Sequence, residues 1–182
     1  ELKRPPVIVG HCFGGMVAML IVAHHPQIAK SLVLVDTNYK PPFYSELFLK
    51  YSSLIHLLHL FIRFAPKSHI SGHVDFEKFQ NTADYDIQRI VSDIVHVSLR
   101  SYLNIIDNTL NYNGYDLLKK IRIPTLIIEG LNDTIFPPQV AQELHKRIIT
   151  SQLKLIKDAN HILVLNNPED LTRSIYFFIK SL

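Results

Sequence analysis

The sequence is poor in cysteine and has no long apolar run. Its single cysteine, Cys12, cannot form an internal disulfide, so a disulfide-stabilised secreted domain is not indicated. The longest apolar window, residues 54–64, is interrupted by two histidines and an arginine, and it is shorter than the roughly 20 residues of a membrane span. We therefore predict a soluble, cytoplasmic protein with no membrane span.

Nothing in the charge pattern indicates a nucleic-acid partner. The chain carries 19 basic and 16 acidic residues, and the basic ones form no cluster that could follow a phosphate backbone. Metal-binding patterns are also missing, because the ten histidines form no His-Glu-x-x-His element and cysteine-rich spacing is absent. We therefore predict no nucleic acid and no metal. With 182 residues, 47% of them hydrophobic, the chain has the size and composition of one ordinary globular domain.

The apolar pattern predicts an α/β fold, with a parallel sheet flanked by helices. Short continuous apolar runs bounded by turn residues are typical of strands buried on both faces of such a sheet. Two of them enclose an apolar helical segment within about 30 residues, as in a right-handed β-α-β unit. The predicted strands are residues 7–9, 31–35, 123–130 and 153–156, and the predicted helices that accompany them are residues 15–24, 138–149 and 168–179.

The stretch between the second and third predicted strands has a different pattern. Residues 41–118 contain no buried strand pattern but show helical periodicity, for example over residues 87–95. We predict a helical insertion between two core parts, residues 1–40 and residues 119–182. An apolar helix at residues 52–64 could attach to a membrane surface, but its polar face carries too little charge, so we interpret it as a wall of an apolar substrate site.

Residues 7–16, with the sequence VIVGHCFGGM, place the cysteine at a strand-to-helix turn. Gly10 and Gly14 lack the Cβ atoms that would collide when strand and helix come close, and such a turn points the side chain of Cys12 into the crevice at the strand ends. The N-terminus of the following helix favours an anion such as a thiolate, and the backbone N–H of Phe13 can stabilise an oxyanion. The alternative is that Cys12 is a small buried hydrophobic residue.

Two later strand ends carry residues that could serve this cysteine. His161 follows the last predicted strand, where it can act as a general base, and Asp133 lies in the loop after the third strand, where it can orient the imidazole. Asp36, at the end of the second strand, is the rival for the acid, and Asp133 could instead form an Asx turn. His11 lies beside the cysteine, and we expect it to support the substrate-binding pocket.

Together, these segments resemble the α/β-hydrolase superfamily, in its cap-bearing branch of esterases and lipases. The matching blocks are GHCFGG around Cys12, IPTLIIEGLNDTIFPP around Asp133 and DANHILVLNNPEDLTRSIYFFIKSL around His161, and the resemblance covers nearly the whole chain. It implies a catalytic triad of Cys12, His161 and Asp133, and it favours Asp133 over Asp36 as the acid. It also identifies residues 41–118 as the inserted cap.

The sequence departs from the family pattern in three respects. A cysteine replaces the usual serine nucleophile, as in dienelactone hydrolases and polyhydroxyalkanoate synthases, and Asn160 replaces the glycine that commonly precedes the base. The family's first four strands, with a His-Gly loop that donates a second oxyanion hydrogen bond, have no counterpart in these residues. We therefore expect a missing N-terminal segment, or a partner chain, to complete the sheet.

The resemblance implies hydrolysis of an ester, a thioester or a lactone through an acyl-cysteine intermediate, with no cofactor. The apolar cap indicates a small-molecule substrate with a hydrophobic acyl or alkyl part. An acyltransferase that uses the same cysteine thioester is one alternative. A non-catalytic binding protein of the hydrolase fold, or an incomplete fragment, is the other.

Overall fold

A computed structural model describes residues 4–40, residue 60 and residues 72–182. Within them, four parallel strands form one sheet in the order β1-β2-β3-β4, which confirms the predicted α/β class. Apart from residue 60, the predicted wall helix at residues 52–64 lies outside the described residues. The strands are β1 (Val7–His11), β2 (Ser31–Val35), β3 (Thr125–Gly130) and β4 (Ser151–Ile156).

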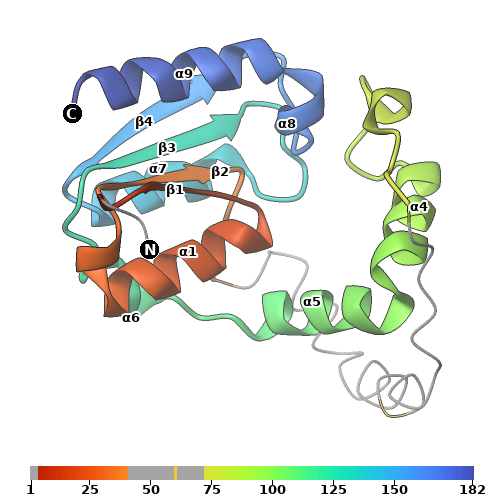
Figure 1. The fold of residues 1–182 in the computed structure, drawn as a ribbon, viewed down its shortest axis with the longest axis horizontal. Coiled ribbons are helices and arrows are strands. Elements are labelled where there is room, and N and C mark those ends of the chain that lie inside the picture. The colour runs from red at the N-terminus through yellow and green to blue at the C-terminus, as the bar shows by residue number, and fades with distance from the viewer. Residues whose placement is uncertain (1–3, 41–59, 61–71) are drawn as a thin grey trace.

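Helices connect these strands and cover the sheet (Figure 1). Between β1 and β2 lie α1 (Phe13–His24) and the short 3-10 helix η1 (Pro26–Ile28). The described residues between β2 and β3 form η2 (Phe76–Phe79), α4 (Ile87–Val97), α5 (Leu99–Asn111) and α6 (Tyr115–Leu118). After β3 come α7 (Pro138–Arg147), α8 (Leu163–Asn166) and α9 (Pro168–Lys180).

Two apolar cores attach the helices to the sheet, because successive side chains of a strand point to opposite faces. On β2, Leu32 and Leu34 pack in the core that includes residues of α1, α6 and α7, whereas Val33 and Val35 pack in the core that includes α9. Figure 1 shows α9 on one face of the sheet and α1 on the other. All residues of β2 and β3 are buried, so the packed core fixes the positions of the carboxyl ends of these two strands.

Strand β1 is an outer strand of the sheet. Among the described residues it pairs with β2 alone, and Val9 at its centre is 52% exposed. Leu20 and Ile21 of the adjacent helix α1 are exposed as well. The segment or partner chain expected to complete the sheet stays a prediction.

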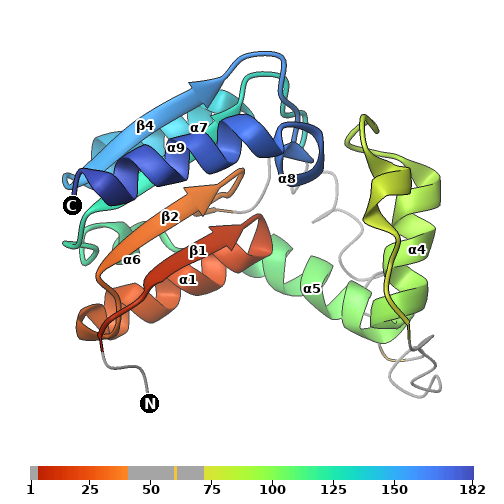
Figure 2. The same cartoon turned by 45° about the horizontal axis from the view of Figure 1, so that its top comes forward.

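Helices α4 and α5 lie beyond the carboxyl ends of the strands. In both ribbon views, α4 stands opposite the end of the sheet to which the strand arrows point (Figure 2). Residues 72–118, the described stretch of the predicted insertion, contain helices and no strand, while the division of the chain into core and cap stays a prediction. None of the described helices combines the length and the apolar character needed to cross a membrane.

Candidate active site

The turn between β1 and α1 holds Cys12 in an uncommon backbone conformation. Its φ is 51° and its ψ is −123°, a combination that residues with side chains rarely adopt. The N–H of Cys12 donates to the carbonyl of Val35 at 3.0 Å, and the hydroxyl of Thr37 donates to the carbonyl of Cys12 at 2.6 Å. The half-buried thiol does not cap α1. This turn of residues 10–15, the elbow, therefore fixes the backbone of Cys12, while the sulfur makes no hydrogen bond to the N-terminus of α1.

The close approach of β1 to α1 requires glycine at two positions. A Cβ on Gly10 would lie 2.5 Å from the carbonyl oxygen of Gly14, closer than real Cβ atoms come, and a Cβ on Gly15 would overlap the side chain of Thr37. A Cβ on Gly14 would meet nothing within 4 Å. The prediction that Gly14 is needed for close packing is therefore wrong. Gly15 is the second necessary glycine, because it packs on the threonine that holds the elbow.

The loops after β3 and β4 bring Asp133 and His161 together. Nδ1–H of His161 donates to Oδ2 of Asp133 at 2.7 Å, and both side chains are buried. Gly130 allows the two loops to approach, because a Cβ there would lie 2.5 Å from the carbonyl oxygen of Ala159. The structure thus places the predicted acid and base in contact, and their catalytic roles stay a prediction.

Asp133 also forms the Asx turn that was the rival interpretation of this residue. Its Oδ1 accepts hydrogen bonds from the backbone N–H groups of Ile135 and Phe136, both at 2.7 Å. The turn uses one carboxylate oxygen and His161 uses the other, so the two interpretations do not compete. The turn holds the carboxylate still in front of the imidazole.

Asp36, the rival acid, has other partners. Its Oδ1 accepts a hydrogen bond from the N–H of Gly130 at 3.0 Å, and its carboxyl lies in a buried group with those of Glu129 and Asp133, whose oxygens are within 4.8 Å of one another. Burial raises the pKa of Asp36 to about 8, and burial and the charges of Asp36 and Asp133 raise the pKa of Glu129 to about 11. Protons on Asp36 and Glu129 relieve the repulsion among the three carboxyls.

His11 contacts the loop that carries the predicted base. Its Nε2–H donates to the carbonyl of His161 at 2.9 Å, and the two rings lie 5.2 Å apart. Burial, followed by the charge of His161, lowers the pKa of His11 to about 4, so its imidazole is neutral at neutral pH and acts as a donor. The pocket described below is lined by other residues, and the predicted part of His11 in substrate binding stays a prediction.

The environment of His161 favours its charged form. Burial acts to lower the pKa of His161, but hydrogen bonds to Asp133 and Cys12, with the charges of both groups, outweigh it and raise that pKa well above the ordinary value. An imidazolium and a thiolate stabilise each other in such a pair. The imidazole of His161 therefore lies against the sulfur of Cys12 in a setting that favours its charged form.

An apolar pocket of about 360 Å³ opens onto Cys12 and His161. One wall comes from the ends of the core strands and the other from α4 and α5, which stand opposite them. Ile90 belongs to the apolar stripe predicted over residues 87–95. The wall residues include Cys12, Phe13, Phe136 and His161 from the core, and Ile90, Tyr102, Ile105 and Ile106 from α4 and α5.

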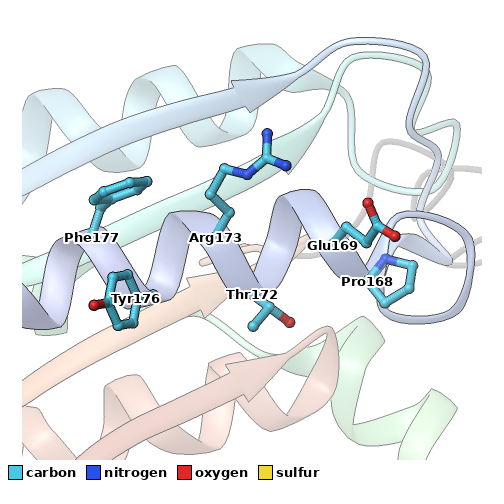
Figure 3. Close-up of a pocket in the computed structure, with 6 residues that line it drawn as sticks. All are labelled: Pro168, Glu169, Thr172, Arg173, Tyr176 and Phe177. Carbon is cyan, nitrogen blue, oxygen red and sulfur yellow. The ribbon is translucent and has the colours of Figure 1, made fainter.

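A wider hollow of about 640 Å³ lies along α9 (Figure 3). All of its lining side chains belong to this helix, among them Arg173, Tyr176 and Phe177. Neither Cys12 nor His161 reaches it, so the smaller pocket is the candidate active site.

Comparison with known proteins agrees with the fold. The family profile described as alpha/beta hydrolase fold matches residues 2–168. The chain belongs to the α/β-hydrolase family. The resemblance inferred from the three sequence blocks is thereby confirmed.

Two curated relatives of this α/β hydrolase are esterases or lipases by name. Pimeloyl-acyl-carrier-protein methyl ester esterase of Neisseria meningitidis is 28% identical, over 93% of this chain and 55% of that protein. Monoacylglycerol lipase ABHD6 of Bos taurus is 28% identical, over 98% of this chain and 56% of that protein. The chain therefore spans little more than half the length of these relatives. The solved enol-lactonase of Burkholderia xenovorans shares the fold, with a TM-score of 0.68 and 18% identity over 94% of this chain and 64% of that one.

Sequence reasoning missed three residues around the site. Thr37 bonds the backbone of Cys12, and Glu129 belongs to the cluster of three buried carboxyls. Both are polar residues near the ends of buried strands, and that position is the sequence signal that could have indicated them. Asp84 contacts both the acid and base loops from far away in the sequence, and no motif indicates it.

Proposed function

We propose that this α/β hydrolase cleaves a carboxylic ester, a thioester or a lactone through an acyl-Cys12 intermediate. The observation that carries the proposal is the 2.7 Å hydrogen bond between His161 and Asp133, at the floor of an apolar pocket that Cys12 also lines. The strained backbone of Cys12 supports it, because such strain is typical of functional positions.

The first half of the reaction acylates the enzyme. The Cys12 thiolate attacks the carbonyl carbon of the substrate, a C–S bond forms, and the carbonyl oxygen becomes an oxyanion beside the N–H of Phe13. Phe13 is the first residue of α1, so its N–H has no acceptor within the helix. The bond to the leaving group then breaks, and the His161 imidazolium gives its proton to the departing alkoxide or thiolate.

The second half releases the acyl group. Neutral His161 takes a proton from a water molecule, and the resulting hydroxide attacks the thioester carbonyl. The C–S bond breaks, the carboxylic acid leaves, and the Cys12 thiolate returns to its pairing with protonated His161. Asp133 orients the imidazole through both steps and stabilises its positive charge.

The pocket supports a substrate with a hydrophobic acyl or alkyl part. Isoleucine and aromatic side chains form much of its wall, and its volume of about 360 Å³ suits a small organic group.

The test is hydrolysis of p-nitrophenyl esters and matching thioesters of increasing chain length by the protein expressed from its complete coding sequence. We expect a rapid release of p-nitrophenol followed by steady turnover, both lost in Cys12→Ala and strongly reduced in His161→Ala. His73→Ala, which changes an exposed histidine outside the site, is the matched control and should retain activity.

Two results would overturn hydrolysis. Acylation without turnover, relieved by adding an alcohol or thiol acceptor, would identify an acyltransferase. Absence of any release of p-nitrophenol, together with no alkylation of Cys12 by iodoacetamide at neutral pH, would show that the cysteine is not a nucleophile.

A further inference from the structure

Asp84 joins the two loops that carry the acid and the base. It lies between η2 and α4 and is 7% exposed. Its Oδ1 accepts a hydrogen bond from the backbone N–H of His161 at 2.9 Å, and its Oδ2 accepts from the N–H and the hydroxyl of Thr134 at 2.9 and 2.6 Å. Thr134 directly follows Asp133. One carboxylate thus binds the backbone of the base and the neighbour of the acid.

The residues before Asp84 are bonded to the same histidine loop. The N–H of Asn81 donates to the side-chain oxygen of Asn166 at 2.7 Å. The carbonyl of Thr82 accepts from the side-chain amides of Asn160 and Asn166 at 2.9 and 3.0 Å. Asn160 stands where the family commonly has glycine, so this departure from the family pattern serves to attach residues 81–84 to the loop of the base.

The same segment continues into the wall of the pocket. Asp84, Tyr85 and Arg89 all line it, and Nη2 of Arg89 donates to the backbone carbonyl of Asp84 at 2.5 Å. The side chain of Asp84 therefore contacts the loops of the triad, while its carbonyl contacts a residue of the substrate-facing wall. Asp84 therefore connects this wall to both loops.

We propose that Asp84 is a positioning residue that sets the spacing between the Asp133 and His161 loops and so keeps the imidazole aligned with Cys12. The inference rests on the proposed function, since it concerns the same triad. An aspartate is needed because both oxygens accept hydrogen bonds, whereas an asparagine would direct its NH2 group at one of the N–H donors. Misplacing a catalytic group by about 1 Å costs on the order of 100-fold in rate.

The test compares Asp84→Asn with Asp86→Asn. Asp86 is a matched control, because it caps α4 by accepting from the N–H of Arg89 and asparagine caps helices equally well. In Asp84→Asn, kcat for p-nitrophenyl butyrate should fall about tenfold to a hundredfold with little change in KM. The pKa of His161, followed by NMR of its ring, should also fall, because its bond to Asp133 loosens. In Asp86→Asn both should stay at the wild-type values.

The titratable groups of Cys12, His11, Asp133 and Asp36 act on the ring of His161, and none of them is altered in these variants. Asp84→Asn also removes a carboxyl group close to the histidine, whereas Thr134→Val removes a hydrogen bond and leaves that carboxyl in place. A folded Asp84→Asn protein with wild-type kcat and wild-type His161 pKa would overturn the proposal. If Asp84→Asn folds poorly, Thr134→Val removes one of the three bonds and should give a smaller loss of both quantities. No loss of either in that variant would count equally against it.

Failure of this inference is distinguishable from failure of the proposed function. The titration of His161 needs no substrate, and in Thr134→Val it tests the positioning role with the Asp84 carboxyl still present. A wild-type protein that neither hydrolyses esters nor becomes acylated would contradict the proposed function, while a lowered His161 pKa in Thr134→Val would still support the positioning role.

Discussion

The loops after β2 and β3 each place a buried aspartate at the carboxyl end of the sheet, yet the two aspartates have opposite surroundings. Asp36 accepts a single hydrogen bond, from Gly130, and its other oxygen has no hydrogen-bond partner among the described residues. Asp133 accepts three, from His161 and from two backbone N–H groups. Because a buried charge needs several donors, burial raises the pKa of Asp36 to about 8, while the carboxyl of Asp133 has donors on both oxygens.

The comparison shows that the number of donors, and not the position at a strand end, decides what each loop does. The β2 loop is structural, since Thr37 next to Asp36 bonds the carbonyl of Cys12 and packs on Gly15. The β3 loop supplies the carboxyl that accepts the hydrogen bond from His161. Of these two equivalent places in the sheet, the first therefore contacts the backbone of Cys12 and the second contacts the imidazole of His161.

Exchanging each aspartate for asparagine should separate the two loops most clearly. Asp133→Asn should lower kcat/KM by about 10³- to 10⁴-fold, because an amide cannot stabilise the imidazolium or fix its tautomer. Asp36→Asn should change it less than about tenfold, because the residue is already neutral and asparagine can still accept from Gly130. Steady-state hydrolysis of one p-nitrophenyl ester measures both. The reverse order would make Asp36 the acid.

The pKa of His161 should distinguish the same two variants without any substrate. The hydrogen bond to Asp133 raises this pKa, so its removal in Asp133→Asn should lower the pKa by more than one unit. Asp36→Asn should leave it close to the wild-type value. NMR titration of the ring is the measurement, and an equal fall in both variants would show that the two carboxyls act on the base alike.

The protonated carboxyls predict how stability depends on pH. Glu129 has a folded-state pKa near 11, raised from 4.5, so the folded protein keeps a proton that the unfolded chain loses, and stability falls as pH rises between these values. Glu129→Gln removes this penalty. Its free energy of unfolding, relative to wild type, should grow by about 1 kcal/mol for each pH unit between about pH 5 and pH 8 in urea denaturation.

A constant difference between Glu129→Gln and wild type across that range would show that Glu129 is ionised in the folded protein. The same comparison on Asp36→Asn should show a gain that levels off near pH 8, where the Asp36 carboxyl itself ionises. The different pH dependence of the free energy of unfolding in the two variants thus distinguishes the titration of Glu129 from that of Asp36.

The smallest expected effect concerns the glycines of the elbow. Gly15→Ala should lower the free energy of unfolding by about 1 to 3 kcal/mol, because the new Cβ overlaps Thr37 of the β2 loop. Gly14→Ala should be neutral or stabilise by up to about 1 kcal/mol, since its Cβ points to open space within a helix. Thermal or urea unfolding measures both, and equal losses would mean that the β2 loop does not pack on the elbow as described.

The parallel sheet could be predicted from local signals, whereas the choice of Asp133 over Asp36 as the partner of His161 depended on the resemblance to the α/β-hydrolase superfamily. Buried strands are continuous apolar runs, and residues at the ends of parallel strands must meet at one edge. Asp84 could not be predicted, since its three hydrogen bonds join residues 50 and 77 positions away and no spacing rule marks them. The choice of Gly15 over Gly14 depends on the side chain of Thr37, which the sequence does not place.

The most direct test of the central claim is the mass of the enzyme during turnover. The protein is mixed with p-nitrophenyl butyrate, quenched in acid at increasing times and analysed intact and after digestion. The triad predicts one added butyryl group on the peptide that contains Cys12, formed within the initial release of p-nitrophenol and persisting longer in Asp133→Asn. An acyl group on another residue, or none while hydrolysis proceeds, would contradict it.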